Sequence, residues 1–197
     1  MGPKASLLLH KLILDLSKDY YQSETDQDFP SIIHLSLSNE LPDRTKFICG
    51  DSTDNPAHPA FRHLLSLMTL SECQNQGLVV GIPCNTFFSP KIWQPFIGEI
   101  DKYPALKIKI PHLIQCSVDI AIEKVGTNSA IGILSTSGER TMNVYKDQIA
   151  ANNIQAIQTN DDLQTQLQNC IFNKEWGLKY VHADLEKCAN ILNNIIN

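Results

Sequence analysis

The stretch Leu78-Val79-Val80-Gly81-Ile82-Pro83-Cys84-Asn85-Thr86-Phe87-Phe88 decides the expected fold of this chain. It begins with a short apolar run rich in β-branched side chains, which is typical of a buried strand. In open parallel sheets, ligands bind just beyond the carboxyl ends of the strands. We therefore expect the thiol of Cys84 to lie in a crevice at the sheet edge, beside the side chains of Asn85 and Thr86. Such a place is suited to chemistry on a small anion.

The rest of the chain alternates strand-like and helix-like segments. Helical spacing of apolar residues predicts helices at residues 3–19, 59–75, 114–124, 140–151, 161–172 and 183–196, with a short helix around Trp93. Apolar or β-branched runs predict strands at residues 31–38, 78–82, 106–111, 130–135 and 154–157. This alternation indicates the α/β class, with mostly parallel sheets flanked by helices. We expect two α/β domains, at residues 1–104 and 105–197.

The composition argues against several classes of protein. A formal net charge of −5 over 197 residues, without basic blocks, argues against partners such as nucleic acid or an anionic membrane surface. No apolar run approaches the roughly 20 residues that a membrane-spanning helix needs. The six cysteines, at positions 49, 73, 84, 116, 170 and 188, form neither a CxxC pair nor a Cys/His cluster with metal spacing. This usage is typical of a reduced cytoplasmic protein without a structural zinc site.

Polar residues also follow two other predicted strands. Asp43, Arg44 and Thr45 lie in a turn-like stretch after the first of these strands. Thr136 and Ser137 follow the strand that ends at Ser135. Each set has a purely structural explanation, either as a surface ion pair that caps a turn or as a helix cap. A helix cap can also bind a carboxylate, because the N-terminus of a helix attracts anions.

Four stretches of the chain match the motifs of one known family. Met1-Gly2-Pro3-Lys4-Ala5 is similar to the end of a GGMGP-x-A start, and Asn39-Glu40-Leu41-Pro42-Asp43-Arg44-Thr45 is similar to N-x-x-x-PDRT. Ile82-Pro83-Cys84-Asn85-Thr86 is similar to PCNT, and residues 131–136 are similar to a GLLAT step. Together they resemble the cofactor-independent aspartate/glutamate racemase family, and specifically its aspartate racemase branch. The resemblance implies two pseudo-symmetric α/β domains with the active site in the cleft between them, and a homodimer.

The resemblance also implies a chemistry. Enzymes of this family invert the α-carbon of an acidic amino acid with two cysteines, without pyridoxal phosphate or any other cofactor. By resemblance, Cys84 is one of the two acid/base groups, and the small-molecule substrate is aspartate or glutamate. Arg44 matches an arginine that pairs with a substrate carboxylate, to which a planar guanidinium donates two parallel hydrogen bonds. Further substrate-binding positions by resemblance are Asp43, Thr45, Asn85, Thr86, Thr136 and Lys174.

The chain departs from the family in two places. The second family cysteine lies in a Gly-Cys-Thr-Glu motif, which this sequence lacks. Cys170 and Cys188 both lie in helical patterns with apolar neighbours, so we expect the chain to stop short of the second catalytic cysteine. The Phe87-Phe88 pair stands where a small residue and a histidine often follow the CNT motif. We expect the two rings to be able to line a less polar pocket.

Two alternatives to the racemase are open at this point. Relatives with the same fold decarboxylate malonates or isomerise maleate with a cysteine at the same strand end, and a less polar pocket favours them. The chain also lacks the strands with which the family begins and ends. A second alternative is therefore a catalytically silent remnant, which binds an acidic ligand or a partner protein through an open sheet edge.

Overall fold

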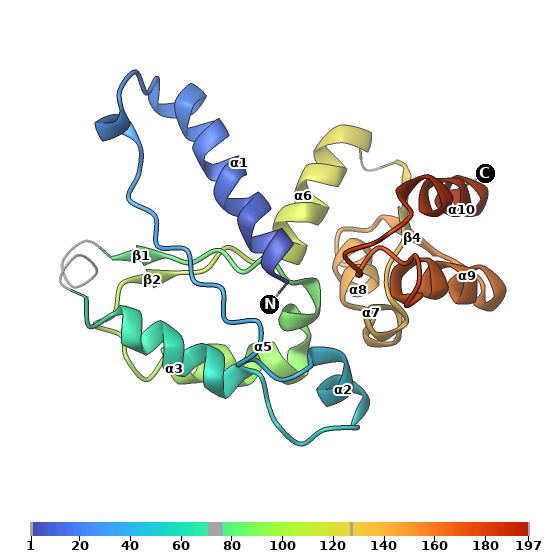
Figure 1. Cartoon of the computed structure of the whole chain (residues 1–197), viewed down its shortest axis with the longest axis horizontal. Coiled ribbons are helices and arrows are strands. Elements are labelled where there is room, and N and C mark those ends of the chain that lie inside the picture. The colour runs from blue at the N-terminus through green and yellow to red at the C-terminus, as the bar shows by residue number, and fades with distance from the viewer. Residues whose placement is uncertain (1, 71–76, 127, 197) are drawn as a thin grey trace. The chain divides into compact units, whose positions relative to one another are not determined.

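The computed structural model describes residues 2–70, 77–126 and 128–196. It confirms the α/β class, because short parallel strands are flanked by helices (Figure 1). The chain divides into two compact units, Met1–Leu113 and Ile114–Asn197. The sequence placed the boundary after residue 104, but strand β2 (Ile108–Lys109) pairs with β1 (Leu78–Val79) and belongs with it to the first unit. Within the described ranges, no helix combines the length and the apolar character needed to cross a membrane.

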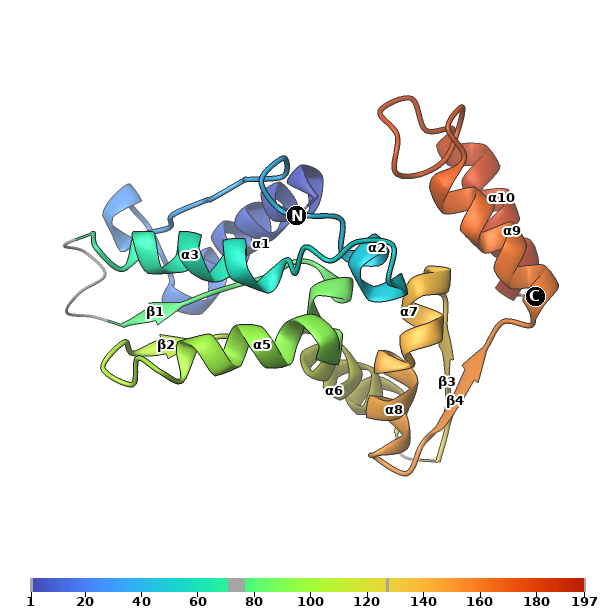
Figure 2. The same cartoon turned by 90° about the horizontal axis from the view of Figure 1, so that it is seen from below.

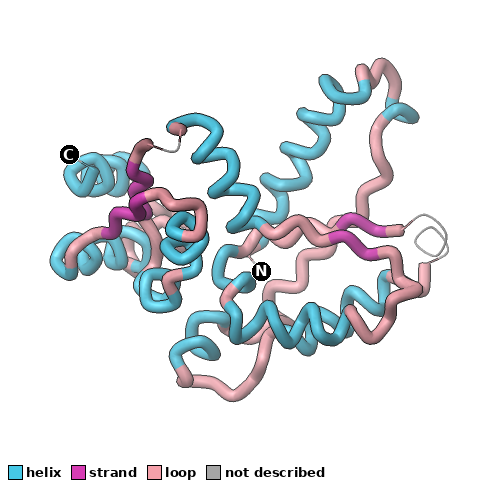
Figure 3. Tube along the Cα trace, turned by 180° about the vertical axis from the view of Figure 1, so that it is seen from behind, coloured by secondary structure: helices cyan, strands magenta, loops and turns pink. Residues whose placement is uncertain are grey.

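The first unit surrounds a short parallel strand pair with helices. Its elements, in chain order, are α1 (Pro3–Tyr21), η1 (Asp26–Asp28), α2 (Arg44–Cys49), α3 (Ala57–Leu67), β1 (Leu78–Val79), η2 (Asn85–Phe88), α5 (Pro90–Ile100) and β2 (Ile108–Lys109), where η denotes a 3-10 turn. β1 and β2 pair in parallel, with Leu78 opposite Ile108 (Figure 3). α3 packs against α5 along its length (Figure 2). The largest fully buried side chains of this unit come from η2 and α5: Phe87, Phe88, Ile92 and Phe96.

The helix predicted at residues 59–75 is shorter in the structure. α3 ends at Leu67 and is followed by a turn, and positions 71–75 of the prediction lie outside the described residues. Gly77 then leads into β1 with a φ of +75°, and a Cβ at this position would stand 2.9 Å from the carbonyl oxygen of Lys107. Glycine tolerates both the positive φ and the close approach, which places β1 against the chain that enters β2.

The strand predicted at residues 31–38 is wrong. Residues 31–37 form an irregular segment that leads into a turn, and no strand of the described ranges pairs with it. Ile33 and Leu35 remain 48% and 45% exposed. A strand is completed by hydrogen bonds to a neighbouring strand. An apolar, β-branched sequence is therefore not sufficient where no partner lies alongside it.

The second unit repeats the same construction. Its elements, in chain order, are α6 (Leu113–Val125), β3 (Ala130–Ile133), α7 (Ser137–Met142), α8 (Val144–Ala150), β4 (Gln155–Gln158), α9 (Asp161–Phe172) and α10 (Leu185–Ile196). β3 and β4 pair in parallel, from Ala130 opposite Gln155 to Ile133 opposite Gln158. α8 packs against both strands around a core of Val118, Ile133, Ile149 and Ile154. Because the strands are parallel, α7 and α9 both begin at the same edge of this sheet.

The helices predicted at residues 114–124 and 161–172 are confirmed, but the one predicted at residues 140–151 is divided. Asn143 has a φ of 53°, ends α7 and precedes α8. Asparagine adopts this left-handed conformation more readily than most residues, because its short polar side chain can bond locally. The break makes α7 a short helix, which begins shortly after the end of β3.

The two helices at the end of the chain pack on each other around two cysteines. Cys170 of α9 and Cys188 of α10 are 0% and 1% exposed. Each thiol donates a weak hydrogen bond to the backbone carbonyl of the other residue, at 3.7 and 3.8 Å. Burial, together with the neighbouring thiol of Cys188, raises the pKa of the Cys170 thiol to about 11. Both thiols are therefore parts of the core of the second unit.

Candidate active site

Cys84 lies just beyond β1, at the point where the chain turns into η2. Its backbone is extended, with φ −151° and ψ 102°, and its carbonyl oxygen accepts a hydrogen bond from the amide of Phe87 at 3.1 Å. Its half-buried Sγ lies 3.3 Å from Oγ1 of Thr86. The thiol thus has a hydroxyl as a direct neighbour, and the side chain of Asn85 beside it is exposed.

The two phenylalanines that follow hold this turn in place. Phe87 and Phe88 are 0% and 2% exposed. The ring of Phe87 meets Phe96 edge-on at 5.1 Å between centroids, and the ring of Phe88 lies 4.8 Å from Trp93. The sequence suggested that these two rings line a less polar pocket, and the structure corrects this expectation. Both rings are packed inside the core, since together they supply the apolar area that anchors η2.

Asp43 acts as the cap of α2. Its Oδ1 accepts hydrogen bonds from the backbone amides of Thr45 at 2.8 Å and Lys46 at 3.1 Å. These bonds satisfy donors that every helix leaves unpaired at its N-terminus. At the other end, Gly50 adopts a φ of 90° and ends the helix. The carboxylate of Asp43 therefore fixes where α2 begins, and with it the position of Arg44, the first helical residue.

The guanidinium of Arg44 has few partners among the described residues. In the part of the chain that the structure describes, its only hydrogen bond is a long one of 3.4 Å from a terminal nitrogen to the carbonyl oxygen of Pro42. Its Nε is buried and has no partner, and no carboxylate of the described residues forms an ion pair with it. A buried unsatisfied donor is costly, so the group is suited to receive an external acceptor.

Arg44 and Cys84 belong to neighbouring segments of the first unit. α2 packs against η2, the turn that Cys84 precedes. A hydrogen bond also connects α2 to α5. The Nζ of Lys91, near the start of α5, donates to the carbonyl oxygen of Ile48 in α2 at 2.9 Å. Tertiary structure thus brings the predicted trio at residues 43–45 to the same part of the first unit as Cys84, Asn85 and Thr86.

His112 is a further polar residue near this turn, and the sequence reasoning did not select it. It follows β2 as Cys84 follows β1, and its ring lies 4.5 Å from that of Phe88 and 5.1 Å from that of Trp93, between centroids. Burial among these rings lowers the pKa of His112 below its ordinary value of 6.5. Its position shortly after a strand is the signal that could have identified it.

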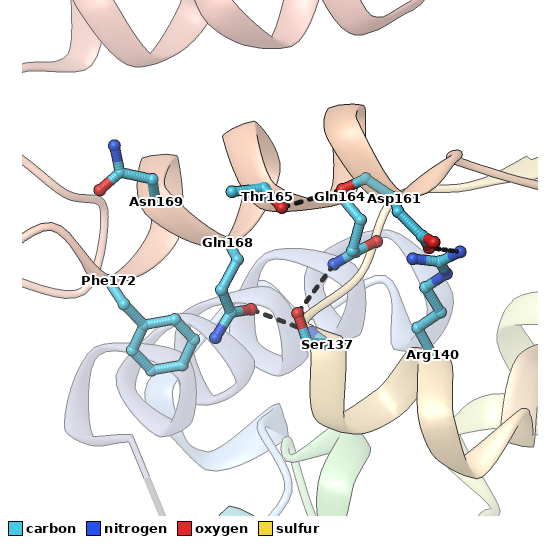
Figure 4. A pocket seen from close by; sticks show the side chains of 8 residues that line it. All are labelled: Ser137, Arg140, Asp161, Gln164, Thr165, Gln168, Asn169 and Phe172. Atoms are coloured by element: carbon cyan, nitrogen blue, oxygen red, sulfur yellow. Dashed lines mark hydrogen bonds and ion pairs between the residues drawn. The ribbon is translucent and has the colours of Figure 1, made fainter.

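Two of the predicted substrate-binding residues lie in the second unit. Thr136 follows β3 and caps α7, since its Oγ1 accepts a hydrogen bond from the amide of Glu139 at 3.3 Å. Lys174 lies in the turn after α9, where its side chain is exposed and its carbonyl oxygen is 2.7 Å from Nε2 of His182. The same unit contains a polar cavity of about 610 Å³ beside Thr136, lined by residues of α7 and α9 (Figure 4). Among the described residues, no group of three His, Cys, Asp or Glu side chains is arranged to hold a metal ion.

Comparison with known proteins identifies the fold. No protein-family model matches the chain, and no curated protein matches it. Among solved structures, the chain is similar to the aspartate racemase of Picrophilus torridus, with a TM-score of 0.67 and 17% sequence identity. The match covers 100% of this chain and 71% of that chain. The chain therefore shares the racemase fold, as the sequence motifs led us to expect.

Proposed function

We propose that this chain is a cofactor-independent, racemase-type enzyme that moves the α-proton of aspartate or glutamate through the thiol of Cys84. The observation that carries the proposal is the guanidinium of Arg44 on α2, which has no carboxylate partner among the described residues and a buried Nε without an acceptor there, on a helix that packs against the turn beginning at Cys84. A cationic fork on a helix that packs against the turn of a thiol suits a reaction on an amino acid carboxylate. The shared fold with an aspartate racemase supports the same assignment.

The chemistry follows from the groups of the first unit. Arg44 binds a substrate carboxylate through two parallel hydrogen bonds, which orients the α-carbon toward Sγ of Cys84. The thiolate accepts the α-proton, and the electron pair of the broken C–H bond moves onto the substrate carboxylate. The hydroxyl of Thr86 and the amide of Asn85 then stabilise the enolate-like anion. In heavy water the thiol proton is replaced by deuterium from the solvent, and transfer of this deuteron to the α-carbon completes the exchange.

Inversion at the α-carbon requires a second acid on the opposite face. Cys170 and Cys188 are 0% and 1% exposed in the core of the second unit, so neither thiol contacts a bound substrate. We therefore propose that the described residues support exchange with retention of configuration, through Cys84 alone. Thr136 and Lys174, as substrate-binding residues, stay predictions.

Proton NMR in deuterated water tests this proposal. L-Aspartate and L-glutamate are incubated separately with the full chain, the α-proton signal is followed, and the products are separated by chiral chromatography. Loss of the signal with retention of the L-isomer supports Cys84 acting alone, and formation of the D-isomer would mean that a second acid acts. Absence of exchange with both substrates would overturn the proposal and favour a silent ligand-binding protein.

Three variants make the test specific. Replacing Cys84 by serine is expected to lower the exchange rate by roughly 10²–10⁴-fold, because a hydroxyl is a far weaker acid/base group at neutral pH. Replacing Arg44 by lysine keeps the charge but removes the fork, so KM is expected to rise roughly tenfold. Replacing Cys116 by serine is the matched control, since this exposed thiol lies on α6 in the second unit. Equal rates for the Cys84 and Cys116 variants would contradict the assignment.

A further inference from the structure

Two adjoining cavities lie at the edge of the second sheet, where α7 and α9 begin. The larger, of about 610 Å³, is lined by Ser137, Arg140, Asp161, Gln164, Thr165, Gln168, Asn169 and Phe172. The smaller, of about 300 Å³, is lined by Ser137, Arg140, Thr141, Asn143, Gln158 and Gln164. Both share the side chain of Arg140, which stands opposite Asp161 in Figure 4. Both cavities are open to solvent, and their volumes lie within the range of pockets that hold small molecules, roughly 300–1,000 Å³.

Most N–H groups of the Arg140 guanidinium have no hydrogen-bond acceptor among the described residues. Its side chain is 29% exposed and, in the described part of the chain, makes one hydrogen bond, from a terminal nitrogen to Oδ1 of Asp161 at 2.9 Å. The side chain of Asp161 is 94% exposed, and an ion pair with so exposed a partner contributes little. The remaining N–H groups of the guanidinium therefore have no acceptor among the described residues, although the side chain lines both cavities.

Gln158 supplies a second unpaired donor. It is the last residue of β4, opposite Ile133 in the parallel register, and it lines the smaller cavity. Its Nε2 is buried and has no hydrogen-bond partner within the described ranges of the chain. A buried NH₂ group without an acceptor is destabilising, and an acceptor in the cavity would remove this cost.

The other polar groups around the cavities form hydrogen bonds with one another. Gln164, 5% exposed, accepts from the hydroxyl of Thr159 at 2.7 Å and donates to the carbonyl oxygen of Ser135 at 3.0 Å. Oε1 of Gln168 accepts from the amide of Ser137 at 2.9 Å. Figure 4 shows Gln164 and Gln168 both directed from α9 toward Ser137. These bonds fix the walls of the cavity, so a ligand meets the donors of Arg140 and Gln158 without rearranging them.

We propose that the smaller cavity binds the carboxylate of a small monoanionic organic acid, with Arg140 and the side-chain amide of Gln158 as its donors. The guanidinium provides one positive charge, and the carboxylate of Asp161 stands beside it. Glu139, the residue before Arg140, is a further buried acidic side chain. The two carboxylates offset the positive charge of Arg140, which disfavours a dianion such as phosphate relative to a single carboxylate held by hydrogen bonds. The site stands on the second unit alone and does not depend on the reaction proposed for Cys84.

An NMR titration of the full ¹⁵N-labelled chain tests the site. Sodium acetate is added at constant ionic strength, and the side-chain signals of Gln158 and of Nε of Arg140 are followed. We expect both signals to shift and saturate with acetate, and not with sodium chloride or inorganic phosphate. Shifts that grow without saturation, or that appear equally with chloride or phosphate, would overturn the inference.

Variants locate the binding within the molecule. Arg140→Gln is expected to weaken acetate binding at least tenfold, and Gln158→Leu about fivefold. Lys146→Gln removes the same charge from the exposed surface of α8 and is expected to leave the affinity unchanged. If Arg140→Gln loses its folded spectrum, Arg140→Lys keeps the charge without the fork and is expected to weaken binding severalfold. Unchanged affinity in the Arg140 and Gln158 variants would refute the site.

Arg44→Lys separates this inference from the reaction proposed for the first unit. The variant is expected to keep its acetate affinity, because Arg44 belongs to the first unit and Arg140 to the second. Loss of acetate binding in Arg44→Lys, with unchanged binding in Arg140→Gln, would place the anion in the first unit and overturn the inference.

Discussion

Replacement of Lys91 by methionine should loosen the contact that holds Arg44 near Cys84. The Nζ of Lys91 donates to the carbonyl oxygen of Ile48 at 2.9 Å, which ties the start of α5 to the last turn of α2. Ile48 is 4% exposed, so its carbonyl lies at the edge of the core. Methionine keeps an unbranched apolar side chain that is as long as lysine up to Cε, and it lacks the charged donor.

The magnitude follows from the type of hydrogen bond and its exposure. A hydrogen bond from a charged donor contributes roughly 1.5–3 kcal/mol when it is shielded from water. Lys91 is itself exposed, so we reduce this figure to about 1 kcal/mol of unfolding free energy. If the same loosening displaces Arg44 from the substrate, about 1 kcal/mol corresponds to roughly a fivefold lower exchange rate at the substrate α-carbon.

Urea unfolding measures the stability change in the first unit. Trp93 lies in α5 and reports on this unit, and a Trp176→Phe background removes the other tryptophan, which lies in the second unit. Lys102→Met is the matched control, because Lys102 pairs with Glu99 at the exposed end of the same helix. We expect this control to change the unfolding free energy by less than about 0.5 kcal/mol.

The comparison between the two lysine variants decides the matter. Equal unfolding free energies and equal exchange rates for Lys91→Met and Lys102→Met would refute the reasoning that the Lys91 bond positions α2. A loss of stability in Lys91→Met with an unchanged exchange rate would show that α2 keeps its place on η2 through packing alone.

Three further predictions test other parts of the structure. Cys170 and Cys188 should resist a thiol reagent at pH 8 that modifies the exposed Cys49 rapidly, because both are buried and the pKa of Cys170 is raised to about 11. Mass spectrometry after a short pulse measures the labelling, and equal labelling of all three cysteines would contradict the packing of α9 on α10. Burial lowers the pKa of His112 below 6.5, so the unfolded chain binds the proton more readily and the stability of the fold decreases as the pH drops below about 6.5. The urea midpoint should therefore decrease less between pH 7.5 and pH 5 in His112→Phe than in the wild type. Gln164→Leu should lower the unfolding free energy by about 2–3 kcal/mol, since it removes three hydrogen bonds of a 5% exposed side chain, and a loss under 0.5 kcal/mol in urea unfolding would argue against this network.

Local sequence signals predicted the helices well where cap and period agreed. α9 begins at Asp161 and ends at Phe172, as predicted, because Asn160 accepts a hydrogen bond from the amide of Leu163 and an apolar stripe follows it. The parallel arrangement of the strands was also correct, since strand-like and helix-like segments alternate. The same signals failed at Asn143, where one residue with positive φ divides a continuous helical pattern.

The pairing of distant segments could not be predicted from the sequence. Nothing in residues 31–38 shows that a partner strand is lacking, because strand formation depends on a neighbour that lies elsewhere in the chain. Nothing in the Phe87-Phe88 pair shows that both rings turn inward. The unpaired donors of Arg140 and Gln158 were also invisible, since an absent acceptor is a property of the folded surroundings.

The sequence by itself determined the α/β class, the family-like motifs, and the candidate thiol of Cys84 at the end of a strand. These follow from residue type and spacing over a few turns of chain, where the physical causes are local. Only the tertiary structure decided that α2 packs on η2, that Arg44 lacks a carboxylate partner among the described residues, and that Cys170 and Cys188 are buried. Contacts between distant segments depend on which surfaces exclude water together, and this is settled only when the whole unit packs.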